Sequence, residues 1–394
     1  MDITTILSRG VDEVIEKSHL EQALRSGKKL RVKLGIDPTA KDLHLGHTVV
    51  LRKLKHFQNA GHQIVLIIGD FTATIGDPSG RNEQRPVLTE KEAKANMKNY
   101  LKEAGKVIDI KKTEVRYNSE WFKSKGMAFL IELTSKFTIA RIMERDDFQK
   151  RIKDGRDVSM LEALYPLLQG YDSVAVKADV EVGGTDQKFN LLTGRKVQRR
   201  YGMKEQDVVT VPLIEGMDGV KKMSKSYGNY IGLSESPQEM YSKIMSIPDS
   251  LIQKYFLLLT DVSEIELEPL NPLKKLENVN FNPKAWKEKL GTEIVKLYHS
   301  VKDAEKAKPE FDNKFGKSKG EIKADFELKK NPGSYAILDV LVEGKLAASK
   351  SEARRKIQEG AVTLNGSKIK DVDVSVKLTK GTLIRLGKRF LRIV

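Results

Sequence analysis

The segment Ile64-Val65-Leu66-Ile67-Ile68-Gly69 is apolar at every position before its glycine, and it limits the fold more than any other segment. A strand with one solvated face alternates apolar and polar residues, whereas a continuous apolar run suits a strand that is covered on both faces. Residues 30–36 form an earlier strand-like segment, and residues 45–60 between the two have apolar residues at helical spacing. This succession predicts an α/β fold with a Rossmann-like parallel sheet, covered by helices on both faces.

The remainder of the 394-residue chain divides into parts of different composition. Residues 1–232 alternate strand-like and helix-like segments, and residues 233–316 are mainly helix-like. Residues 317–334 are polar and rich in lysine, and they contain the breaker Asn-Pro-Gly, so we expect a linker there. Residues 335–394 contain a capped helix and an Asn-Gly hairpin turn. The predicted order is an α/β domain, an α-helical domain, a linker and a small α+β domain.

The charge of the chain favours a polyanionic partner. The 70 Lys and Arg residues exceed the 54 Asp and Glu residues, which gives a net charge of +16. Residues 335–394 carry 13 basic and 6 acidic residues, a net charge of +7. The candidate contacts with a phosphate backbone lie on one predicted helix: Lys350, Arg354, Arg355 and Lys356. A solvated basic surface would produce the same charge pattern.

Other residue types exclude several classes of function. The chain has no cysteine, so disulfides, thiolate metal sites and a cysteine nucleophile are excluded. The longest apolar run is far too short to cross a bilayer, and the acidic residues near the N-terminus do not match a secretory signal. We therefore expect a soluble, cytoplasmic protein without a membrane partner.

The sequence His44-Leu45-Gly46-His47 lies at the predicted beginning of the 45–60 helix. A helix N-terminus exposes N–H groups and attracts anions, and it disfavours a charged imidazolium. The two histidines are three positions apart, so they share one face as neutral hydrogen-bond donors. Gly46 permits a ligand to approach the backbone closely. An isolated His-x-x-His would more often be a helix cap or a packed ring.

A second motif, Lys222-Met223-Ser224-Lys225-Ser226, follows a predicted strand at residues 208–213. Two lysines in such a loop can stabilise the negative charge that develops on phosphates in a transition state. The competing interpretation is a solvated lysine-rich loop. The two motifs together suggest a split site for a nucleotide triphosphate.

Two further groups of polar residues complete the pattern. Gly183-Gly184-Thr185-Asp186-Gln187 combines small residues with a carboxylate that can accept from ribose hydroxyls. Tyr165, Gln169 and Asp172 fall on one face of a predicted helix, where they would form a polar pocket or a structural network.

These strings together resemble the bacterial tyrosyl-tRNA synthetases, which are class I aminoacyl-tRNA synthetases. His44 to His47 resembles the "HIGH" signature with leucine in place of isoleucine, and Lys222 to Ser226 reproduces "KMSKS". The segments at 165–172 and 183–187 resemble the tyrosine-pocket strings of the family. Residues 351–366 resemble an RNA-binding domain shared with a small-subunit ribosomal protein. The resemblance covers essentially the whole chain in the family's domain order.

The resemblance implies a two-step reaction. L-tyrosine and Mg²⁺-bound ATP give tyrosyl-adenylate and pyrophosphate, and the tyrosyl group is then transferred to the 3′ end of tRNA(Tyr). It also implies a homodimer, with no protein-bound metal or organic cofactor. The implied catalytic residues are His44, His47, Lys222 and Lys225. The implied ATP-binding residues are Asp37, Thr39, Gly46, Gly184, Asp186, Lys225 and Ser226.

The implied tyrosine-binding residues are Asp77, Tyr165, Gln169, Asp172 and Gln187. Asp77, Tyr165 and Gln169 would bind the ammonium group, Gln187 would lie near the carboxylate, and Asp172 would accept the phenol proton. The sequence departs from the family pattern at Lys33, where many members have a tyrosine that contacts the phenol hydroxyl, and at Leu34, where a cysteine can occur. The second partner of the phenol is therefore open.

Two other functions fit parts of the pattern. A tryptophanyl-tRNA synthetase shares the class I motifs, but it would need an indole pocket in place of Gln169 and Asp172. An RNA-binding protein that kept the fold and lost catalysis would not need the intact histidine and lysine motifs. Amino-acid-dependent exchange of pyrophosphate into ATP separates these alternatives.

Overall fold

The computed structural model describes residues 3–38, 42–79, 90–271, 282–315, 324–369 and 371–394. Contacts within the chain define two compact units, Met1–Lys308 and Pro309–Val394, and each is described by itself. None of the helices in the described segments is long and apolar enough to cross a membrane.

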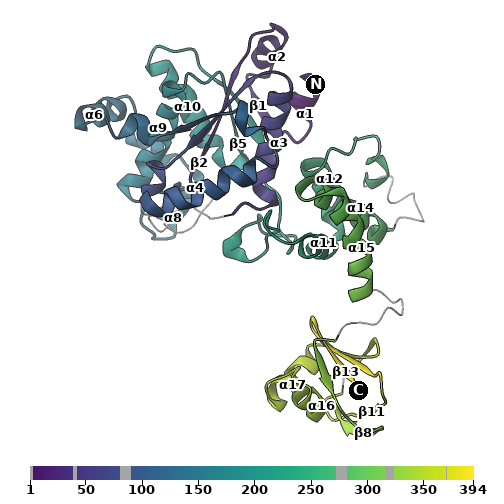
Figure 1. Cartoon of the computed structure of the whole chain (residues 1–394). Helices are drawn as coiled ribbons and strands as arrows, with labels where there is room; N and C mark the ends of the chain where they lie inside the picture. The colour runs from purple at the N-terminus through teal and green to yellow at the C-terminus, as the bar shows by residue number, and fades with distance from the viewer. Residues whose placement is uncertain (1–2, 39–41, 80–89, 272–281, 316–323, 370) are drawn as a thin grey trace. The chain divides into compact units, whose positions relative to one another are not determined.

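The first unit is built on a six-stranded sheet with the order β1-β6-β5-β2-β3-β4 (Figure 1). Its strands are β1 (Glu13–Ile15), β2 (Arg31–Ile36), β3 (Gln63–Ile68), β4 (Glu114–Tyr117), β5 (Val180–Gly184) and β6 (Asp207–Val211). Strands β2 to β6 are parallel to one another, and β1 pairs antiparallel with β6. The predicted parallel sheet is confirmed.

The order of the strands places a crevice at the centre of the sheet. The chain runs from β2 outward to β3 and β4 on one side, and then to β5 and β6 on the other side of β2. Ligands bind at such a switch point, outside the carboxyl ends of the strands. The residues that follow β2 and those that follow β5 therefore meet at this crevice.

Helices cover both faces of the sheet. In β3, Val65 and Ile67 pack into one apolar core with Leu167 and Val197, which belong to the helices α9 (Met160–Ala175) and α10 (Lys188–Arg200). Helix α3 (Leu45–Asn59) lies on the opposite side of the sheet from α9 and α10 (Figure 1). The continuous apolar run of β3 is explained, because both faces of this strand are covered.

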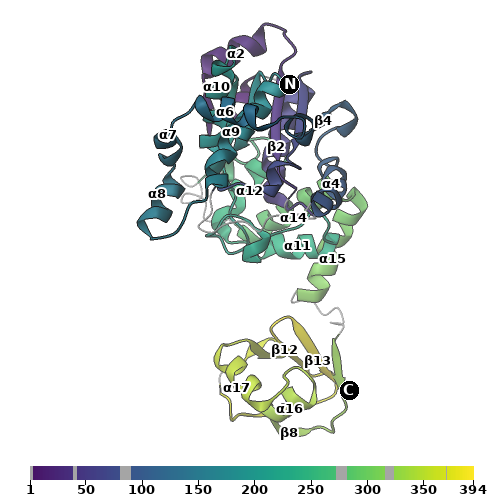
Figure 2. The same ribbon diagram turned by 90° about the vertical axis from the view of Figure 1, so that its left-hand side faces the viewer.

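The remaining helices of this part are shorter, apart from α4, and they surround the sheet (Figure 2). They are α1 (Ile3–Ser8), α2 (Lys17–Arg25), α4 (Glu90–Ala104), α5 (Ser119–Phe122), α6 (Met127–Ser135), α7 (Ile139–Met143) and α8 (Asp146–Lys153). The 3₁₀ turns are η1 (Thr72–Thr74), η2 (Ile110–Lys112), η3 (Thr185–Gln187), η4 (Lys225–Tyr227), η5 (Asp249–Leu251) and η6 (Glu268–Leu270).

The segment after the sheet is helical, as predicted. Its helices are α11 (Pro237–Met245), α12 (Ile252–Leu259), α14 (Pro283–Tyr298) and α15 (Val301–Phe315). Helix α14 begins at a proline and is capped by Asn282, whose side chain accepts a hydrogen bond from the N–H of Ala285 at 3.3 Å. Proline is well tolerated at this first position, because its nitrogen would have no partner inside the helix.

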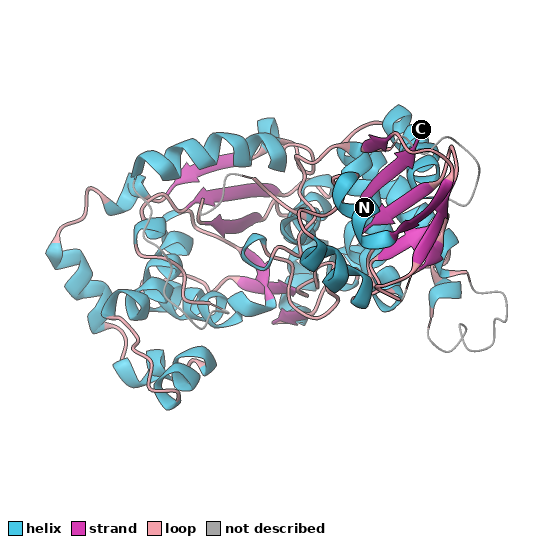
Figure 3. Ribbon diagram, turned by 90° about the horizontal axis from the view of Figure 1, so that it is seen from below, coloured by secondary structure: helices cyan, strands magenta, loops and turns pink. Residues whose placement is uncertain are grey.

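The second unit packs its strands against two helices, α16 (Ile337–Glu343) and α17 (Lys350–Gln358) (Figures 2 and 3). One sheet has the order β10-β9-β12-β13-β7, and β8 pairs with β11 in a separate ribbon. The strands are β7 (Phe326–Leu328), β8 (Gly333–Ala336), β9 (Val362–Leu364), β10 (Ser367–Lys368), β11 (Ser375–Leu378), β12 (Leu383–Leu386) and β13 (Arg389–Ile393).

The predicted linker at residues 317–334 is wrong in its second half. Strand β7 lies within it and pairs in parallel with β13, and β8 begins at Gly333 and pairs with β11. Both are short strands at the edge of a sheet, and their side chains are only half-buried or exposed. An edge strand of this kind tolerates the polar, lysine-rich composition that indicated a linker.

Candidate functional site

The side chains of the two histidines in the first motif cap the N-terminus of helix α3 by accepting hydrogen bonds from backbone N–H groups. His44 is the N-cap residue, and its Nδ1 accepts a hydrogen bond from the N–H of Gly46 at 3.1 Å. The N–H of His44 donates to Nδ1 of His47 at 3.2 Å. The two rings lie 3.9 Å apart between centroids. Histidine here takes both positions of a capping box, which serine and glutamate usually occupy.

This cap determines where each imidazole carries its proton. Because Nδ1 of each ring accepts from the backbone, the proton of the neutral ring lies on Nε2. Burial, together with His47 and Lys225 nearby, lowers the pKa of His44 to about 2, so its ring is neutral. The two interpretations of the motif are therefore compatible: the histidines cap the helix through Nδ1 and can donate through Nε2.

The lysine motif lies beside this helix because the backbone connects the two segments. The N–H of Leu45 donates to the carbonyl of Ile231 at 2.9 Å, and the N–H of Leu233 donates to that of Leu43 at 3.0 Å. Within the loop, Met223 is buried, and its N–H donates to the carbonyl of Ile214 at 2.8 Å.

Both lysines of the second motif form ion pairs with carboxylates. Lys222 Nζ lies 2.9 Å from Asp186, and Lys225 Nζ lies 3.2 Å from Asp42. All four side chains are partly exposed, so the pairs cost little to separate. Ser226 lies beside Lys225 in η4 and is exposed. The structure therefore brings Asp186, Lys222, Lys225 and the histidines to one region, as the sequence predicted.

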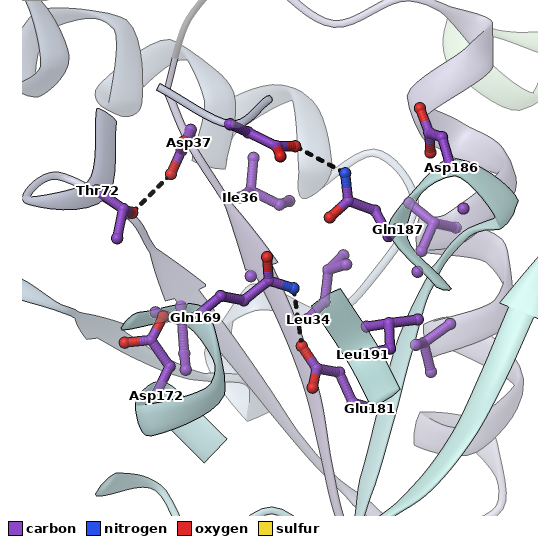
Figure 4. Close-up of a pocket in the computed structure, with 18 of the residues that line it drawn as sticks. Leu34, Ile36, Asp37, Thr72, Gln169, Asp172, Glu181, Asp186, Gln187 and Leu191 are labelled. Atoms are coloured by element: carbon purple, nitrogen blue, oxygen red, sulfur yellow. Dashed lines mark hydrogen bonds between the residues drawn. The ribbon is translucent and has the colours of Figure 1, made fainter. Parts of the chain in front are cut away.

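A cavity of about 250 Å³ lies at the carboxyl ends of β2 and β5 (Figure 4). Helix α9 supplies Tyr165, Gln169 and Asp172 to its wall, which confirms that these residues share one face. The cavity is also lined by Asp37, His47, Asp77, Gly184, Asp186 and Gln187. Thr39 was predicted to bind ATP, and it lies outside the described residues.

Asp172 is a buried carboxylate on this wall. Its Oδ1 accepts a hydrogen bond from the indole N–H of Trp121 at 2.9 Å, and the amide of Asn118 lies 3.5 Å from Oδ2. Burial raises the pKa of Asp172 to about 7, against the opposing effects of Lys33 and these two donors. A buried acceptor of this kind on the wall of a cavity suits a hydroxyl donor in the ligand.

The other polar residues of the cavity form a continuous network. Gln187 donates to Asp77 at 2.7 Å, and Asn190 donates to Gln187 and Gln169 at 3.1 and 3.0 Å. Gln169 in turn donates to Glu181 at 3.2 Å (Figure 4). These contacts hold an amide and a carboxylate at the edge of the cavity, where a charged ligand group can bind.

Asp37 contacts another predicted residue, Tyr165, and also Thr72, which was not predicted. Its carboxylate accepts from the hydroxyl of Tyr165 at 2.9 Å and from Thr72 at 2.8 Å. Gly69 lies so close that an added Cβ would be 2.1 Å from Asp37, so a larger residue there would displace the carboxylate.

Comparison with known proteins decides the family. Residues 25–316 match the family described as tRNA synthetases class I (W and Y), and residues 324–391 match the tyrosine–tRNA ligase SYY-like C-terminal domain. The tyrosine–tRNA ligase of Thermotoga maritima is 50% identical over 98% of this chain and 96% of its own length. That of Dehalococcoides mccartyi is 48% identical over 98% and 97% of the two chains.

The chain belongs to the tyrosine–tRNA ligase family. Its activity is that of a tyrosine–tRNA ligase, and its substrates are tyrosine, ATP and tRNA(Tyr). The tyrosyl-tRNA synthetase of Archaeoglobus fulgidus, solved with L-tyrosine, shares the fold with a TM-score of 0.61 at 23% identity, over 78% of this chain and 99% of that one. The tryptophan enzyme and the RNA-binding protein without catalysis are no longer needed as alternatives.

The sequence prediction missed several residues that contact the predicted site residues. Trp121, Asn118, Asn190 and Asp42 carry no motif, and they reach the site only through the fold. The one available signal was Asn118 itself, since an asparagine directly after a parallel strand lies at the ligand-binding edge of the sheet.

The basic helix of the second unit has the predicted arrangement. In α17, Ala353 and Ile357 are buried in the core, and the basic residues lie outside. Each basic side chain has an acidic neighbour on the surface: Lys350 pairs with Asp339, Arg354 with Asp373, and Arg355 and Lys356 with Glu359. The Asn365-Gly366 turn is also confirmed, with φ of 46° and 87°.

Proposed function

We propose that tyrosine binds in the cavity with its phenol directed toward Asp172 and its ammonium toward Asp77, Tyr165 and Gln169. The support is the position of Asp172 on the cavity wall, buried among neutral donors. A phenol can donate to this carboxylate, whereas a phenyl ring would leave a buried acceptor without its partner, at a cost of about 1–3 kcal/mol. Asp172 is then the main residue that selects tyrosine over phenylalanine.

We propose that ATP lies between helix α3 and the lysine loop. Nε2–H groups of His44 and His47 at a helix N-terminus are suited to phosphate oxygens. Lys222 and Lys225 already face carboxylates across short distances, and the triphosphate would compete with Asp186 and Asp42 for them. Release of Asp186 from Lys222 makes its carboxylate available to the ribose hydroxyls. Glycine at 46 and 184 also lets His44 and Asp186 keep these positions, because an added Cβ would lie 2.9 Å from the His44 ring and 2.8 Å from the Asp186 carboxylate.

The first step then requires positioning and charge rather than covalent catalysis. A carboxylate oxygen of tyrosine attacks the α-phosphorus of Mg²⁺-bound ATP, and the bond to the β-phosphate oxygen breaks to release pyrophosphate. The lysines and imidazoles stabilise charge on the phosphates as it develops. A hydroxyl of the terminal adenosine of tRNA then attacks the tyrosyl carbonyl and displaces AMP.

We propose that α17 of the second unit contacts the phosphate backbone of tRNA. Lys350, Arg354, Arg355 and Lys356 lie on its solvated face, and phosphates can replace their exposed acidic partners at low cost. We further propose, from the family resemblance, that residues 1–232 carry catalysis and that the helical residues 233–316 contact the anticodon of the tRNA.

We also propose a homodimer, working in the cytoplasm. The support is a group of large apolar side chains exposed between residues 127 and 161: Met127, Ile131, Ile139, Ile152, Met160 and Leu161. So many exposed apolar residues in one short stretch are typical of a protein interface. A second copy of the chain is the partner that the family implies.

The decisive experiment is pyrophosphate exchange with tyrosine, tryptophan and phenylalanine. We expect exchange with tyrosine only, and a large loss of the preference for tyrosine over phenylalanine in Asp172→Ala. Asp70→Ala is the matched control, because Asp70 is a buried carboxylate that binds Ser119 at 2.6 and 3.0 Å and does not line the cavity. A wild-type preference in Asp172→Ala would refute the assigned role of Asp172.

A further inference from the structure

A fully buried ion pair lies at the wall of the cavity proposed for tyrosine, to which Glu181 contributes (Figure 4). Lys33 Nζ is 2.8 Å from Glu181, and the two side chains are 0% and 1% exposed. The residues are cross-strand neighbours, on the adjacent parallel strands β2 and β5. A buried ion pair is often no more stable than apolar side chains of the same size, so its stability alone is a weak reason for its presence. Neither residue has a part in the steps described above.

The ammonium of Lys33 also binds helix α9. It donates to the carbonyl of Gln169 at 3.0 Å and to the hydroxyl of Ser173 at 2.8 Å. With the bond to Glu181, these contacts use all three donors of the group. Gln169 and Ser173 lie on either side of Asp172 along the helix, so Lys33 fixes to the sheet the segment that carries the phenol acceptor.

Glu181 determines the orientation of the Gln169 amide. Its carboxylate accepts from Nε2 of Gln169 at 3.2 Å, and also from Ser173 and Gln206. The carbonyl oxygen of the same amide accepts from Asn190 at 3.0 Å. Because the nitrogen of this amide donates and its oxygen accepts, only one of the two orientations of the Gln169 amide satisfies both partners. Glu181 favours that orientation, because a carboxylate can only accept from the amide nitrogen.

The pair also acts on the charge of Asp172. The groups that face this carboxylate are Trp121 and Asn118 as neutral donors, Lys33 from β2 and Glu181 from β5. Burial favours its protonated form, and Lys33 is the strongest influence that lowers the pKa of Asp172 again. Glu181 has a weaker, opposite effect. Of the two charges in the buried pair, Lys33 therefore has the larger effect, and it favours the ionised form of Asp172, which can accept a hydrogen bond from a phenol.

We propose that Lys33 and Glu181 are positioning residues for the phenol end of the tyrosine pocket: Lys33 ties the segment of α9 that carries Asp172 to the sheet and places a positive charge near it, and Glu181 orients Gln169. This inference rests on the proposed role of Asp172. It accounts for a lysine where many relatives have a tyrosine. Lys33 does not contact the phenol in this proposal. Its positive charge acts instead on Asp172, which accepts the hydrogen bond from the phenol.

The test is the pH dependence of kcat/KM for tyrosine in pyrophosphate exchange, which reports groups of the free enzyme. The profile should rise with pH as Asp172 ionises, and Asp172→Asn should abolish this rise. Lys33→Met combined with Glu181→Gln removes both charges and keeps a carbonyl for Gln169. Lys33 affects the pKa of Asp172 more than Glu181 does. In the double variant the inflection of the pH profile should therefore move to higher pH by about one unit. The single change Glu181→Gln should move it to lower pH.

Two readouts separate this role from a merely structural one. The double variant should raise KM for tyrosine most strongly near neutral pH, and the increase should shrink at high pH, where Asp172 is ionised in both enzymes. Arg151→Met with Glu162→Gln is the matched control, because that pair is also buried, with 2.6 Å between its atoms, and does not line the cavity. This control variant should lower the stability of the fold without moving the inflection in the pH profile of kcat/KM.

The outcomes distinguish the two proposals. An unshifted profile in the double variant, or the same direction of shift in both Glu181→Gln and the double variant, would overturn the inference. If the double variant does not fold, the direction of the Glu181→Gln shift decides alone. Absence of tyrosine-dependent exchange in the wild type, or a pH profile that Asp172→Asn leaves unchanged, would overturn the proposed function of the site.

Discussion

The substitution Gly46→Ala adds a single methyl group, and we expect it to slow catalysis while leaving the stability of the fold nearly unchanged. An added Cβ would lie 2.9 Å from both Cε1 and Nδ1 of His44, and 3.6 Å from Cβ of Met223 on another side. Carbon atoms in contact are separated by at least about 3.5 Å, so Gly46→Ala must displace the His44 ring by roughly half an ångström. Met223 limits any compensating tilt of the helix, because it is buried.

The effects on stability nearly cancel. Alanine in place of glycine favours a helix by up to about 1 kcal/mol. Displacement of the ring weakens the hydrogen bond from the N–H of Gly46 to His44, and loss of an N-cap side chain costs about 1 kcal/mol. Catalysis has no such compensation, because Nε2 of His44 moves with the ring. A misplacement approaching 1 Å can cost about 100-fold in rate.

The measurements are thermal unfolding and the rate of tyrosine-dependent pyrophosphate exchange at saturating ATP. We expect an unfolding temperature near that of the wild type and an exchange rate reduced by tenfold to about 100-fold. Gly126→Ala is the control, since Gly126 has φ of −88° and nothing within 4 Å of an added Cβ. A Gly46→Ala enzyme with a wild-type exchange rate would show that the His44 ring has no role in positioning ATP.

Three further predictions follow from the site and the surfaces. Lys225→Ala should slow adenylate formation by about 100-fold and leave the Kd for tyrosine unchanged, because Lys225 pairs with Asp42 outside the tyrosine cavity; a normal rate with weaker tyrosine binding would contradict this. Removal of residues 324–394 should leave exchange intact and impair tRNA charging at physiological salt, and unimpaired charging would count against the RNA role. Ile131→Glu should shift sedimentation from dimer to monomer, whereas the same change at Ile265, which is even more exposed, should not; a monomeric wild type would rule out the dimer.

Local patterns in the sequence predicted the elements whose formation depends on neighbouring residues. The apolar run of β3, the period of α3 and the single face of α9 each follow from backbone geometry. The hairpin turn of the second unit was predictable for the same reason, because Asn365 and Gly366 suit a backbone with positive φ. The family resemblance then supplied the expected roles of the motif residues.

The contacts that join distant segments were not predictable in this way. Trp121 and Asp172 are 51 positions apart, and Lys33 and Glu181 lie on strands separated by most of the α/β part. Composition misled at the edge strand β7, where polar residues are tolerated. The sequence also left the helix cap and the phosphate donor as competing interpretations of His44, since only coordinates reveal that the two uses employ different nitrogens.

The order of strands in the first sheet has a consequence for folding during synthesis on the ribosome. Strands β2, β3 and β4 are neighbours in the sheet and in the chain, so they can pair as soon as about 120 residues have emerged. Strand β1 is the first to emerge, yet it lies at the edge of the sheet, and its partner β6 is made almost 200 residues later. The first of these strands to be synthesised therefore cannot pair in the sheet until the last one, β6, has been made.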